Sequence, residues 1–509
     1  MNLLDAFDSA VRKTPAKAFL RDRGASISYA DMQRRSQRAA AVLQAQGVGR
    51  GDTVALMCLN TPGFVEALFG AWRLGAALVP VNHKLQAPEL QYILDHAQCK
   101  ALIFDAALAP VVAAAPHPCA RLVTEAQEAV PGVQDWDTLV AAARPMEGTR
   151  PADGDIAQVL YTSGTTGRPK GCLLSHRAVT LAAITAALGL SITREERTLM
   201  AMPIWHSSPL NNWFGGTLYM GGTVVLLREY HPQHFLQAVQ DEGVTLYFGA
   251  PVSYFAPLQM LPDFARYDLS SVRAWVYGGG PIGADMARKL ATAYRSDRFY
   301  QVYGMTETGP TGTTLYPEEQ VERAGSIGRV ALPGVDMRVV RDDGEDAGPG
   351  DTGEIWLRTG SVMDGYLHDA QATAAAFAPG GWYRTGDLAR LDDAGYLFIV
   401  DRTKDMVISG GENIYCAEVE RVMNAMPQVF ECAAFGVPHE RLGELLVAAV
   451  VGDDVDAEMV VTEVAGKLAR YKAPGEVDVR TAPLPRNDVG KIDKRRLREE
   501  WIKTKGVTG

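Results

Sequence analysis

The segment from Tyr161 to Gly171 reads Tyr-Thr-Ser-Gly-Thr-Thr-Gly-Arg-Pro-Lys-Gly, and its composition is typical of a loop that binds a polyphosphate. Three glycines let the backbone approach phosphate oxygens closely, four serine and threonine hydroxyls can donate hydrogen bonds, and Lys170 adds positive charge. The segment is not a Walker A loop, because Pro169 stands where that motif needs glycine. The sequence therefore predicts a phosphate loop of another type.

Four later segments add groups that a nucleotide could use. The turn Gly278-Gly279-Gly280-Pro281 follows an apolar run, and Tyr303-Gly304-Met305-Thr306-Glu307 joins an aromatic ring to a hydroxyl and a carboxylate. Asp387 ends the string that begins at Tyr383, and its two carboxylate oxygens suit a pair of hydroxyls. Lys491 follows a glycine in a basic stretch near the end of the chain. Taken one at a time, each of these segments is a weak signal.

Short apolar runs alternate with amphipathic stretches along the first 400 residues, and this order predicts an α/β fold with parallel sheets flanked by helices. Thr53–Cys58, Val244–Phe248 and Arg273–Tyr277 are examples of the expected buried strands. Tyr29–Gln46 and Ala284–Tyr294 are examples of the expected helices. The many glycine-bearing turns between residues 325 and 360 predict a β-rich subdomain.

A second, smaller α+β domain is expected after the string Asp401-Arg402-Thr403-Lys404. It contains a helix near Glu418–Met426, strands near Glu431–Gly436 and Leu446–Gly452, and a helix near Glu458–Arg470. The predicted organisation is a large domain over residues 1–401 and a small mobile domain over residues 402–509, with the hinge near Lys404.

Composition excludes several classes of protein. The 509 residues are 47% hydrophobic and 22% charged, which argues against collagen-like, coiled-coil and mostly disordered chains. The net charge of -10 argues against a nucleic-acid partner. No apolar run is long enough for a transmembrane segment, and the start lacks the features of a signal peptide. Six scattered cysteines without CxxC spacing fit a reducing compartment, so we expect a cytoplasmic protein.

The motifs, in this order and spacing, resemble those of the adenylate-forming superfamily, which includes acyl-CoA synthetases, luciferases and adenylation domains of peptide synthetases. The resemblance covers nearly the whole chain. It implies ATP, Mg²⁺ and coenzyme A as cofactors or cosubstrates and a carboxylic acid as substrate. The implied catalytic residues are Lys491, Glu307, Thr166 and His206, and Thr166 and Glu307 are also the implied metal ligands.

The resemblance also assigns the nucleotide and coenzyme A contacts. In the family the glycine-rich turn binds adenine, the aromatic residue of the second motif stacks on it, and an aspartate with an arginine holds the ribose. The implied contacts are Thr162, Ser163, Gly164, Thr165, Thr166, Gly167, Lys170, Gly279, Gly280, Pro281, Gln301, Tyr303, Gly304, Met305, Thr306, Asp387, Arg402, Lys491, Gly410 and Gly411.

The expected acyl pocket is bounded by Trp205, His206, Asn211, Tyr247, Gly278, Val302, Gly304 and Pro310. The sequence departs from the family here in two ways. Ser207-Ser208-Pro209-Leu210-Asn211 replaces the usual glycine-bearing continuation, and Val302 stands where many relatives carry glycine or alanine. Valine narrows such a pocket, which predicts small or medium aliphatic acids, or a compact aromatic acid. Asn211, Ser207 and Ser208 add polar groups that suit a functionalised acid.

The implied reaction is the joining of a carboxylate to coenzyme A through an acyl-adenylate. Lys491 would bridge the carboxylate and the α-phosphate, while Lys170 and the phosphate loop would hold the β- and γ-phosphates. In the family the small domain then turns about a residue that corresponds to Lys404. Lys491 leaves, and Ser409–Asn413 arrives, where Gly410 and Gly411 leave room for pantetheine.

Three alternatives stay open at this point. The first is adenylation followed by transfer to a carrier-protein thiol or to an amine. An amino-acid adenylation domain is disfavoured, because the stretch from Trp205 to Trp213 has no acidic residue to pair an ammonium group. The second is luciferase-type oxidation, and the third is a non-catalytic binding protein on the same fold. A homodimer is compatible with all of them.

Overall fold

The computed structural model describes residues 1–162, 168–280, 282–402, 406–485 and 492–505. The chain divides into two compact units. The larger unit consists of residues 1–83, 93–161 and 171–401, and the smaller unit consists of residues 84–92, 162–170 and 402–509.

The larger unit contains a nine-stranded sheet in which six neighbouring strands run parallel. Its order is β16-β15-β14-β13-β12-β10-β11-β1-β2. The bounds are β1 Ala18–Asp22, β2 Ala25–Ser28, β10 Arg197–Met200, β11 Thr223–Leu226, β12 Leu246–Gly249, β13 Ala274–Gly278, β14 Phe299–Tyr303, β15 Thr313–Leu315 and β16 Val330–Ala331.

A second, eight-stranded sheet has the order β19-β9-β8-β4-β3-β5-β6-β7. Its strands are β3 Thr53–Met57, β4 Ala77–Pro80, β5 Ala101–Asp105, β6 Ala120–Thr124, β7 Gln134–Asp135, β8 Ile156–Thr162, β9 Lys170–Ser175 and β19 Gly365–Tyr366. The strand β19 comes from far along the chain and pairs antiparallel with β9, with Tyr366 opposite Cys172. This pairing brings the segment before residue 367 to the strand that follows the predicted phosphate loop.

The expected β-rich subdomain is a separate antiparallel sheet. It contains β17 Val335–Val340, β18 Thr352–Thr359, β20 Phe377–Ala378, β21 Trp382–Leu391 and β22 Leu397–Arg402. The architecture therefore confirms the α/β fold class with parallel sheets and a β-rich portion that the sequence predicts.

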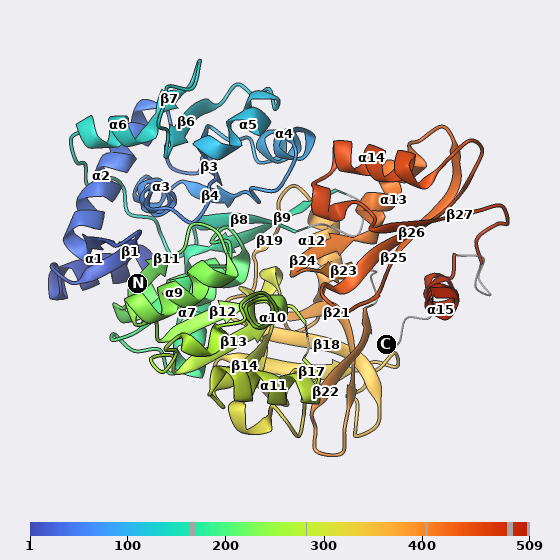
Figure 1. Ribbon diagram of the computed structural model, residues 1–509. Helices are drawn as coiled ribbons and strands as arrows, with labels where there is room; N and C mark the ends of the chain where they lie inside the picture. The colour runs from blue at the N-terminus through green and yellow to red at the C-terminus, as the bar shows by residue number, and fades with distance from the viewer. Residues whose placement is uncertain (163–167, 281, 403–405, 486–491, 506–509) are drawn as a thin grey trace. The chain divides into compact units, whose positions relative to one another are not determined.

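Successive residues of a buried strand point to opposite sides of the sheet. Both faces of the nine-stranded sheet therefore carry apolar side chains, and helices cover both. One apolar cluster holds Phe248 and Val276, and the other holds their neighbours Tyr247 and Trp275. The second cluster packs against α9 (Pro232–Glu242), α10 (Pro251–Met260) and α11 (Ala284–Tyr294), which are labelled beside these strands in Figure 1.

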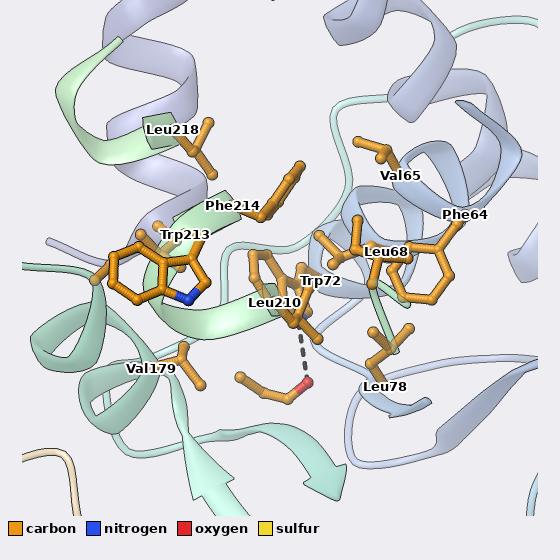
Figure 2. Packing of buried hydrophobic residues seen from close by; sticks show 14 of the residues in the cluster. Phe64, Val65, Leu68, Trp72, Leu78, Val179, Leu210, Trp213, Phe214 and Leu218 are labelled. Carbon is orange, nitrogen blue, oxygen red and sulfur yellow. Dashed lines mark hydrogen bonds between the residues drawn. The ribbon is translucent and has the colours of Figure 1, made fainter. Parts of the chain in front are cut away.

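The other face packs against α3 (Pro62–Arg73), α7 (His176–Gly189) and a π-helical turn, Pro209–Phe214, that continues into α8 (Gly215–Met220). Figure 2 shows Leu210, Trp213 and Phe214 of this turn in the same apolar cluster as Phe64 and Trp72 of α3. Local sequence sets the helix starts: Ser175 caps α7, and its hydroxyl accepts a hydrogen bond from the Ala178 amide.

The smaller unit has a five-stranded sheet with the order β24-β23-β26-β25 and β27 beside β26. Its elements are β23 Met406–Ser409, β24 Glu412–Tyr415, α13 Cys416–Asn424, β25 Val429–His439, β26 Gly443–Gly452, α14 Ala457–Lys467, β27 Glu476–Arg480 and α15 Lys494–Lys505. The α+β character matches the sequence-based expectation, although α14 ends at Lys467, before the expected Arg470. Among the described residues, no helix has the length and apolar composition needed to cross a bilayer.

Candidate functional site in the larger unit

The predicted motifs gather at one edge of the nine-stranded sheet. The glycine-rich turn begins at the last residue of β13, Tyr303 is the last residue of β14, and Trp205 lies shortly after β10. These three strands run in the same direction, and Gly278 lies directly opposite Val302 in the β13–β14 register. Ligands of open α/β sheets bind outside the carboxyl ends of the strands. The fold therefore places three sequence-distant motifs where a ligand site is expected.

Two predicted nucleotide contacts are joined directly. The Tyr303 hydroxyl donates a 2.7 Å hydrogen bond to Oδ2 of Asp387. Asp387 lies on β21 and is only 1% exposed, and its amide donates to the Thr385 hydroxyl. A buried carboxylate is stable only when hydrogen bonds compensate for its loss of water. The contact brings together two residues that are 84 positions apart in the sequence.

Glu307 is held by a tyrosine that the sequence analysis did not single out. It lies in a single 3₁₀ turn, Thr306–Thr308, and its Oε1 accepts a 3.1 Å hydrogen bond from the Tyr366 hydroxyl. Burial, followed by the charge of Glu307, raises the pKa of Tyr366 well above its ordinary value. Tyr366 therefore stays protonated at all working pH values and can act as a constant donor to this carboxylate.

The glycines of the turn have a steric role. Gly279 has a φ of +82°, a left-handed conformation in which a side chain would be strained. Behind the turn, the Tyr277 hydroxyl interacts with the Gln301 and Gln320 side chains at 3.2 and 2.7 Å. Gly280 also lies in the turn, with open space where a side chain would be, and Pro281 lies outside the described residues.

Close backbone packing surrounds the second motif. A Cβ on Gly304 would lie 2.7 Å from the Pro310 carbonyl oxygen, so only glycine fits between these segments. The Asn212 side chain donates to the same Pro310 oxygen at 2.8 Å. Met305 begins the turn that carries Thr306 and Glu307, and its carbonyl accepts from the Thr308 hydroxyl at 3.0 Å. This packing fixes the backbone that presents Thr306 and Glu307.

The predicted phosphate loop connects β8 to β9. Thr162 ends β8 and Lys170 begins β9, while Ser163, Gly164, Thr165, Thr166 and Gly167 lie outside the described residues. The preceding residue, Tyr161, lies 2.8 Å from Nδ1 of His96 through its hydroxyl oxygen. Burial and the neighbouring His368 lower the pKa of His96. The neutral imidazole therefore favours this hydrogen bond to the strand that leads into the loop.

The wall at Val302 is made of a glycine and aromatic rings. A Cβ on Gly278 would lie 3.2 Å from a Val302 methyl group and 3.3 Å from the Phe248 ring. The Phe248 ring is stacked on Trp213 with 5.2 Å between centroids. Val302, Gly278, Phe248 and Trp213 therefore form one packed surface, in which the first two residues were predicted and the last two were not.

Tyr247 does not join this surface. Its ring packs against Phe235, Tyr254 and Trp275 in the apolar cluster on the other face of the sheet. Because neighbouring strand residues alternate, it is Phe248 that lies on the same face of the sheet as Val302. The sequence could not separate these two positions, since all four residues of β12 are buried.

Asn211 is a fully buried carboxamide, and within the described part of the chain neither of its side-chain polar atoms has a hydrogen-bond partner. Ser207 has a buried hydroxyl in the same situation. Nearby in sequence, Trp205 and His206 have ring centroids 5.6 Å apart, and the Trp205 indole donates to Nδ1 of His83 at 2.9 Å. Unsatisfied buried polar groups are costly, and a ligand or water can satisfy them.

In the smaller unit, Gly410 and Gly411 form a two-residue hairpin turn between β23 and β24. Their φ values of +59° and +85° explain the choice of glycine at both positions. Arg402 ends β22, and its side chain is outside the described set, as are Lys404 and Lys491. The hinge and catalytic-lysine assignments stay predictions.

Sequence reasoning missed four residues that contact the predicted site: Tyr366, Phe248, Trp213 and His83. Tyr366 follows a glycine in a segment with little periodicity, so only the β9–β19 pairing reveals its neighbours. Phe248 and Trp213 resemble ordinary core residues in the sequence. A pattern of short buried strands does not tell which face carries the ligand.

Comparison with known proteins places the chain in a family. A family model for AMP-binding enzymes matches residues 7–367, and the model for the C-terminal domain of AMP-binding enzymes matches residues 418–491. The chain therefore belongs to the AMP-binding enzyme family, the adenylate-forming group that the motifs resemble.

Individual relatives cover nearly the whole chain. A feruloyl-CoA synthase of an Amycolatopsis species is 37% identical over 96% of this chain and 97% of its own length. A long-chain-fatty-acid–CoA ligase of Mycobacterium tuberculosis is 36% identical over 94% of both chains. An amide bond synthetase structure from Marinactinospora thermotolerans has 28% identity and a TM-score of 0.87, and the match covers 98% of this chain and 100% of that one.

Proposed function

We propose that this protein is an ATP-dependent carboxylate–coenzyme A ligase that works through an acyl-adenylate. The observation that carries the proposal is that the adenylation motifs lie together at the carboxyl ends of β13 and β14. There the Tyr303 hydroxyl is hydrogen-bonded to Asp387, and the Tyr366 hydroxyl is hydrogen-bonded to Glu307. Membership in the AMP-binding enzyme family supports the adenylation step, and relatives named as CoA ligases support the acceptor.

In the first half-reaction a carboxylate oxygen attacks the α-phosphorus of ATP. The bond between the α-phosphorus and the bridging oxygen breaks, and pyrophosphate leaves. In the second half-reaction the thiol of coenzyme A loses its proton and attacks the acyl carbonyl, and AMP leaves with the electrons of the acyl–phosphate bond. Charge builds on phosphate oxygens in the first step, so oriented donors and cations stabilise its transition state.

This chain's own residues supply orientation and charge. Tyr303 provides a ring for the adenine and holds the Asp387 carboxylate that would face the ribose hydroxyls. Lys170, at the start of β9, would meet the β- and γ-phosphates, and Lys491 would bridge the carboxylate and the α-phosphate. His206, next to Trp205, would line the path of the acyl group.

The donors present fit Mg²⁺. The described residues contain no group of three His, Cys, Asp or Glu side chains that could hold a metal alone. Mg²⁺ instead favours one or two carboxylates together with substrate phosphates and water, and Glu307 would supply such a carboxylate, with the Thr166 hydroxyl as the second ligand that the resemblance implies. When bound, the ion would neutralise charge on the phosphate oxygens.

A second candidate function is transfer of the acyl group to an amine in place of coenzyme A. It has support because an amide bond synthetase is among the structural neighbours. A two-stage assay separates the candidates. Pyrophosphate release is first measured with ATP and a panel of short, medium, long and aromatic acids. The acids that respond are then incubated with coenzyme A or with a primary amine, and the products are identified by mass spectrometry.

Thioester formation at a rate that matches pyrophosphate release supports the ligase. Amide formation without thioester would assign the second candidate. Pyrophosphate release with neither acyl product would indicate another acceptor, such as a carrier-protein thiol. Nucleotide binding without pyrophosphate release for any acid would support a non-catalytic binding protein.

A further inference from the structure

One short segment of the chain, residues 361–366, forms hydrogen bonds to both the side chain and the backbone of Glu307. We call this segment the 361–366 strap. The Tyr366 hydroxyl donates to the Glu307 carboxylate at 3.1 Å. The Met363 amide donates to the Glu307 backbone carbonyl at 2.8 Å. The Ser361 hydroxyl donates to the carbonyl of the next residue, Thr308, also at 2.8 Å. The strap therefore fixes both the backbone and the side chain of Glu307.

The strap is itself anchored to the strand that leaves the phosphate loop. Tyr366 pairs with Cys172 of β9, and the Tyr366 amide donates to the Thr373 hydroxyl at 2.9 Å. The Tyr366 side chain is half-buried and interacts with the Tyr383 side chain. With its backbone and ring both constrained, the Tyr366 hydroxyl has little freedom to leave the Glu307 carboxylate.

This arrangement matters because glutamate has a flexible side chain. A carboxylate that must meet a cation at one point loses rotamer entropy unless another group already holds it. A hydrogen bond from a neutral phenol orients the carboxylate without neutralising its charge, and bonds to charged groups are among the stronger ones. Mutation of a partner that orients a metal-binding carboxylate typically lowers the metal affinity about 10–100-fold.

We propose that Tyr366 is a positioning residue for the ATP–Mg²⁺ site, because its hydroxyl holds the Glu307 carboxylate in the orientation that binds the cation. This inference rests on the proposed function, which makes Glu307 a cation ligand. It also assigns a purpose to the β9–β19 pairing: the pairing links the position of the carboxylate to the strand that follows the phosphate loop.

The test is a metal-binding titration, which needs no turnover. Mn²⁺, used as a paramagnetic probe in place of Mg²⁺, is titrated in the presence of ATP, and free Mn²⁺ is followed by electron paramagnetic resonance. Tyr366→Phe keeps the ring and removes the hydroxyl. We expect it to weaken Mn²⁺ binding about tenfold or more, with ATP affinity in EDTA unchanged.

The chain offers a matched control. Tyr396 also donates its hydroxyl to a glutamate, Glu319, at 2.6 Å, and neither residue belongs to a predicted nucleotide motif. Tyr396→Phe should leave the Mn²⁺ affinity unchanged. In a Glu307→Gln background, Tyr366→Phe should cause no further weakening, because the carboxylate through which it acts is then gone.

Unchanged Mn²⁺ affinity in Tyr366→Phe would overturn the proposal. So would an equal loss of ATP affinity in EDTA, or a full additional loss in the Glu307→Gln background, since each indicates a general structural role. If Tyr366→Phe does not fold, Thr373→Val, which removes the acceptor for the Tyr366 amide, is measured in its place. It should weaken Mn²⁺ binding in the same direction, and normal affinity would again overturn the proposal. A failure of the proposed ligase activity would appear separately, as an absence of pyrophosphate release while Mn²⁺ and ATP still bind.

Discussion

The hydroxyl of Tyr303 lies 2.7 Å from Oδ2 of Asp387 and donates a hydrogen bond to it. Tyr303 ends a strand of the nine-stranded parallel sheet, and Asp387 belongs to the antiparallel β-rich subdomain. A single bond thus connects the ring expected to stack on adenine with the carboxylate expected to bind ribose. The two parts of one nucleoside would be recognised by residues that fix each other's position.

The first prediction concerns this bond. Tyr303→Phe retains the aromatic ring but leaves the buried Asp387 carboxylate without its phenol donor. A hydrogen bond to a charged group contributes about 1.5–3 kcal/mol, so we expect ATP to bind about tenfold more weakly. The KM for the carboxylic acid should change little. Isothermal titration with ATP and steady-state kinetics measure the two effects.

Tyr300→Phe is the matched control for that experiment. Tyr300 lies on the same strand, and its ring contacts Tyr316 with centroids 6.2 Å apart. It has no predicted part in nucleotide binding, so ATP affinity should stay at the wild-type value. Equal losses in the two variants would show that the strand tolerates no loss of a hydroxyl and that the Tyr303–Asp387 bond has no special role.

The second prediction separates the half-reactions. Lys491→Ala should abolish adenylation, because the charge that builds at the α-phosphate loses its counter-ion. Given preformed acyl-AMP and coenzyme A, the same variant should still form thioester at close to the wild-type rate. Thioester formation that falls as far as adenylation would contradict the assignment of Lys491 to the first step alone.

The third prediction is the converse and concerns the hinge. Lys404→Pro fixes φ near about -65°, so a residue that must change its backbone conformation between the two steps would be locked. Acyl-AMP should form and accumulate while coenzyme A transfer stalls, which quenched-flow sampling with radiolabelled ATP can follow. Equal loss of both half-reactions would place the pivot at another residue.

Much of the fold could be predicted because the relevant signals are local. Alternating buried strands and amphipathic helices identify an α/β chain, and glycine-rich strings mark turns such as Gly279, whose φ is +82°. The motifs identify Tyr303, Glu307 and Asp387 by residue type and order. What the sequence lacks is information on distant pairing: the contact between Tyr366 and Glu307 depends on β19 crossing to β9, which no local pattern encodes.

The acyl surface illustrates a second limit. Gly278 and Val302 were predicted as neighbours of the acyl group, and the structure places them directly opposite each other. The sequence analysis named Tyr247 and did not consider Phe248. Because β12 is buried on both faces, the hydrophobicity of its residues does not tell which of them points to which face of the sheet. Only the packing of Phe248 on Trp213 shows which face of the strand belongs with Val302.

The fourth prediction concerns pH and His176, a fully buried residue at the start of α7. Neither ring nitrogen has a hydrogen-bond partner within the described structure, although the ring packs against Trp72. Burial lowers the pKa of His176 from 6.5 to about 4, and the carboxylates of Asp155, Asp153 and Asp5 oppose this shift only in part. The imidazole is therefore neutral in the folded protein at neutral pH.

The sign of the effect follows from proton binding. Below pH 6.5 the unfolded chain protonates this histidine while the folded protein does not, so the free energy of unfolding falls as the pH drops towards 4. At pH 5 this histidine lowers the free energy of unfolding by about 2 kcal/mol relative to neutral pH. His176→Gln should remove it, so that the difference in unfolding free energy between pH 7.5 and pH 5 becomes smaller than in the wild type. Urea unfolding at both pH values measures the change, and an identical pH dependence in the two proteins would refute the prediction.

The last prediction concerns the size of the acid. A Cβ on Gly278 would meet both a Val302 methyl group and the Phe248 ring, so the valine lies on the same surface as a rigid aromatic stack. Val302→Gly removes an isopropyl group from this surface. One or two methyl groups at a pocket wall change discrimination about 10–200-fold. We therefore expect the variant to gain kcat/KM on a cinnamate relative to butanoate by about tenfold or more, with octanoate and benzoate between these extremes.

Val330→Gly is the control, because Val330 lies in the same sheet but is 55% exposed, and the same chemical change there should leave the substrate ranking as it is. If wild-type protein already prefers the cinnamate, or if Val302→Gly gains nothing on it, Val302 does not limit the acid. The size of the acid would then be limited by the neighbouring rings of Phe248 and Trp213. These rings are stacked on each other and cannot move without disrupting the apolar cluster to which they belong.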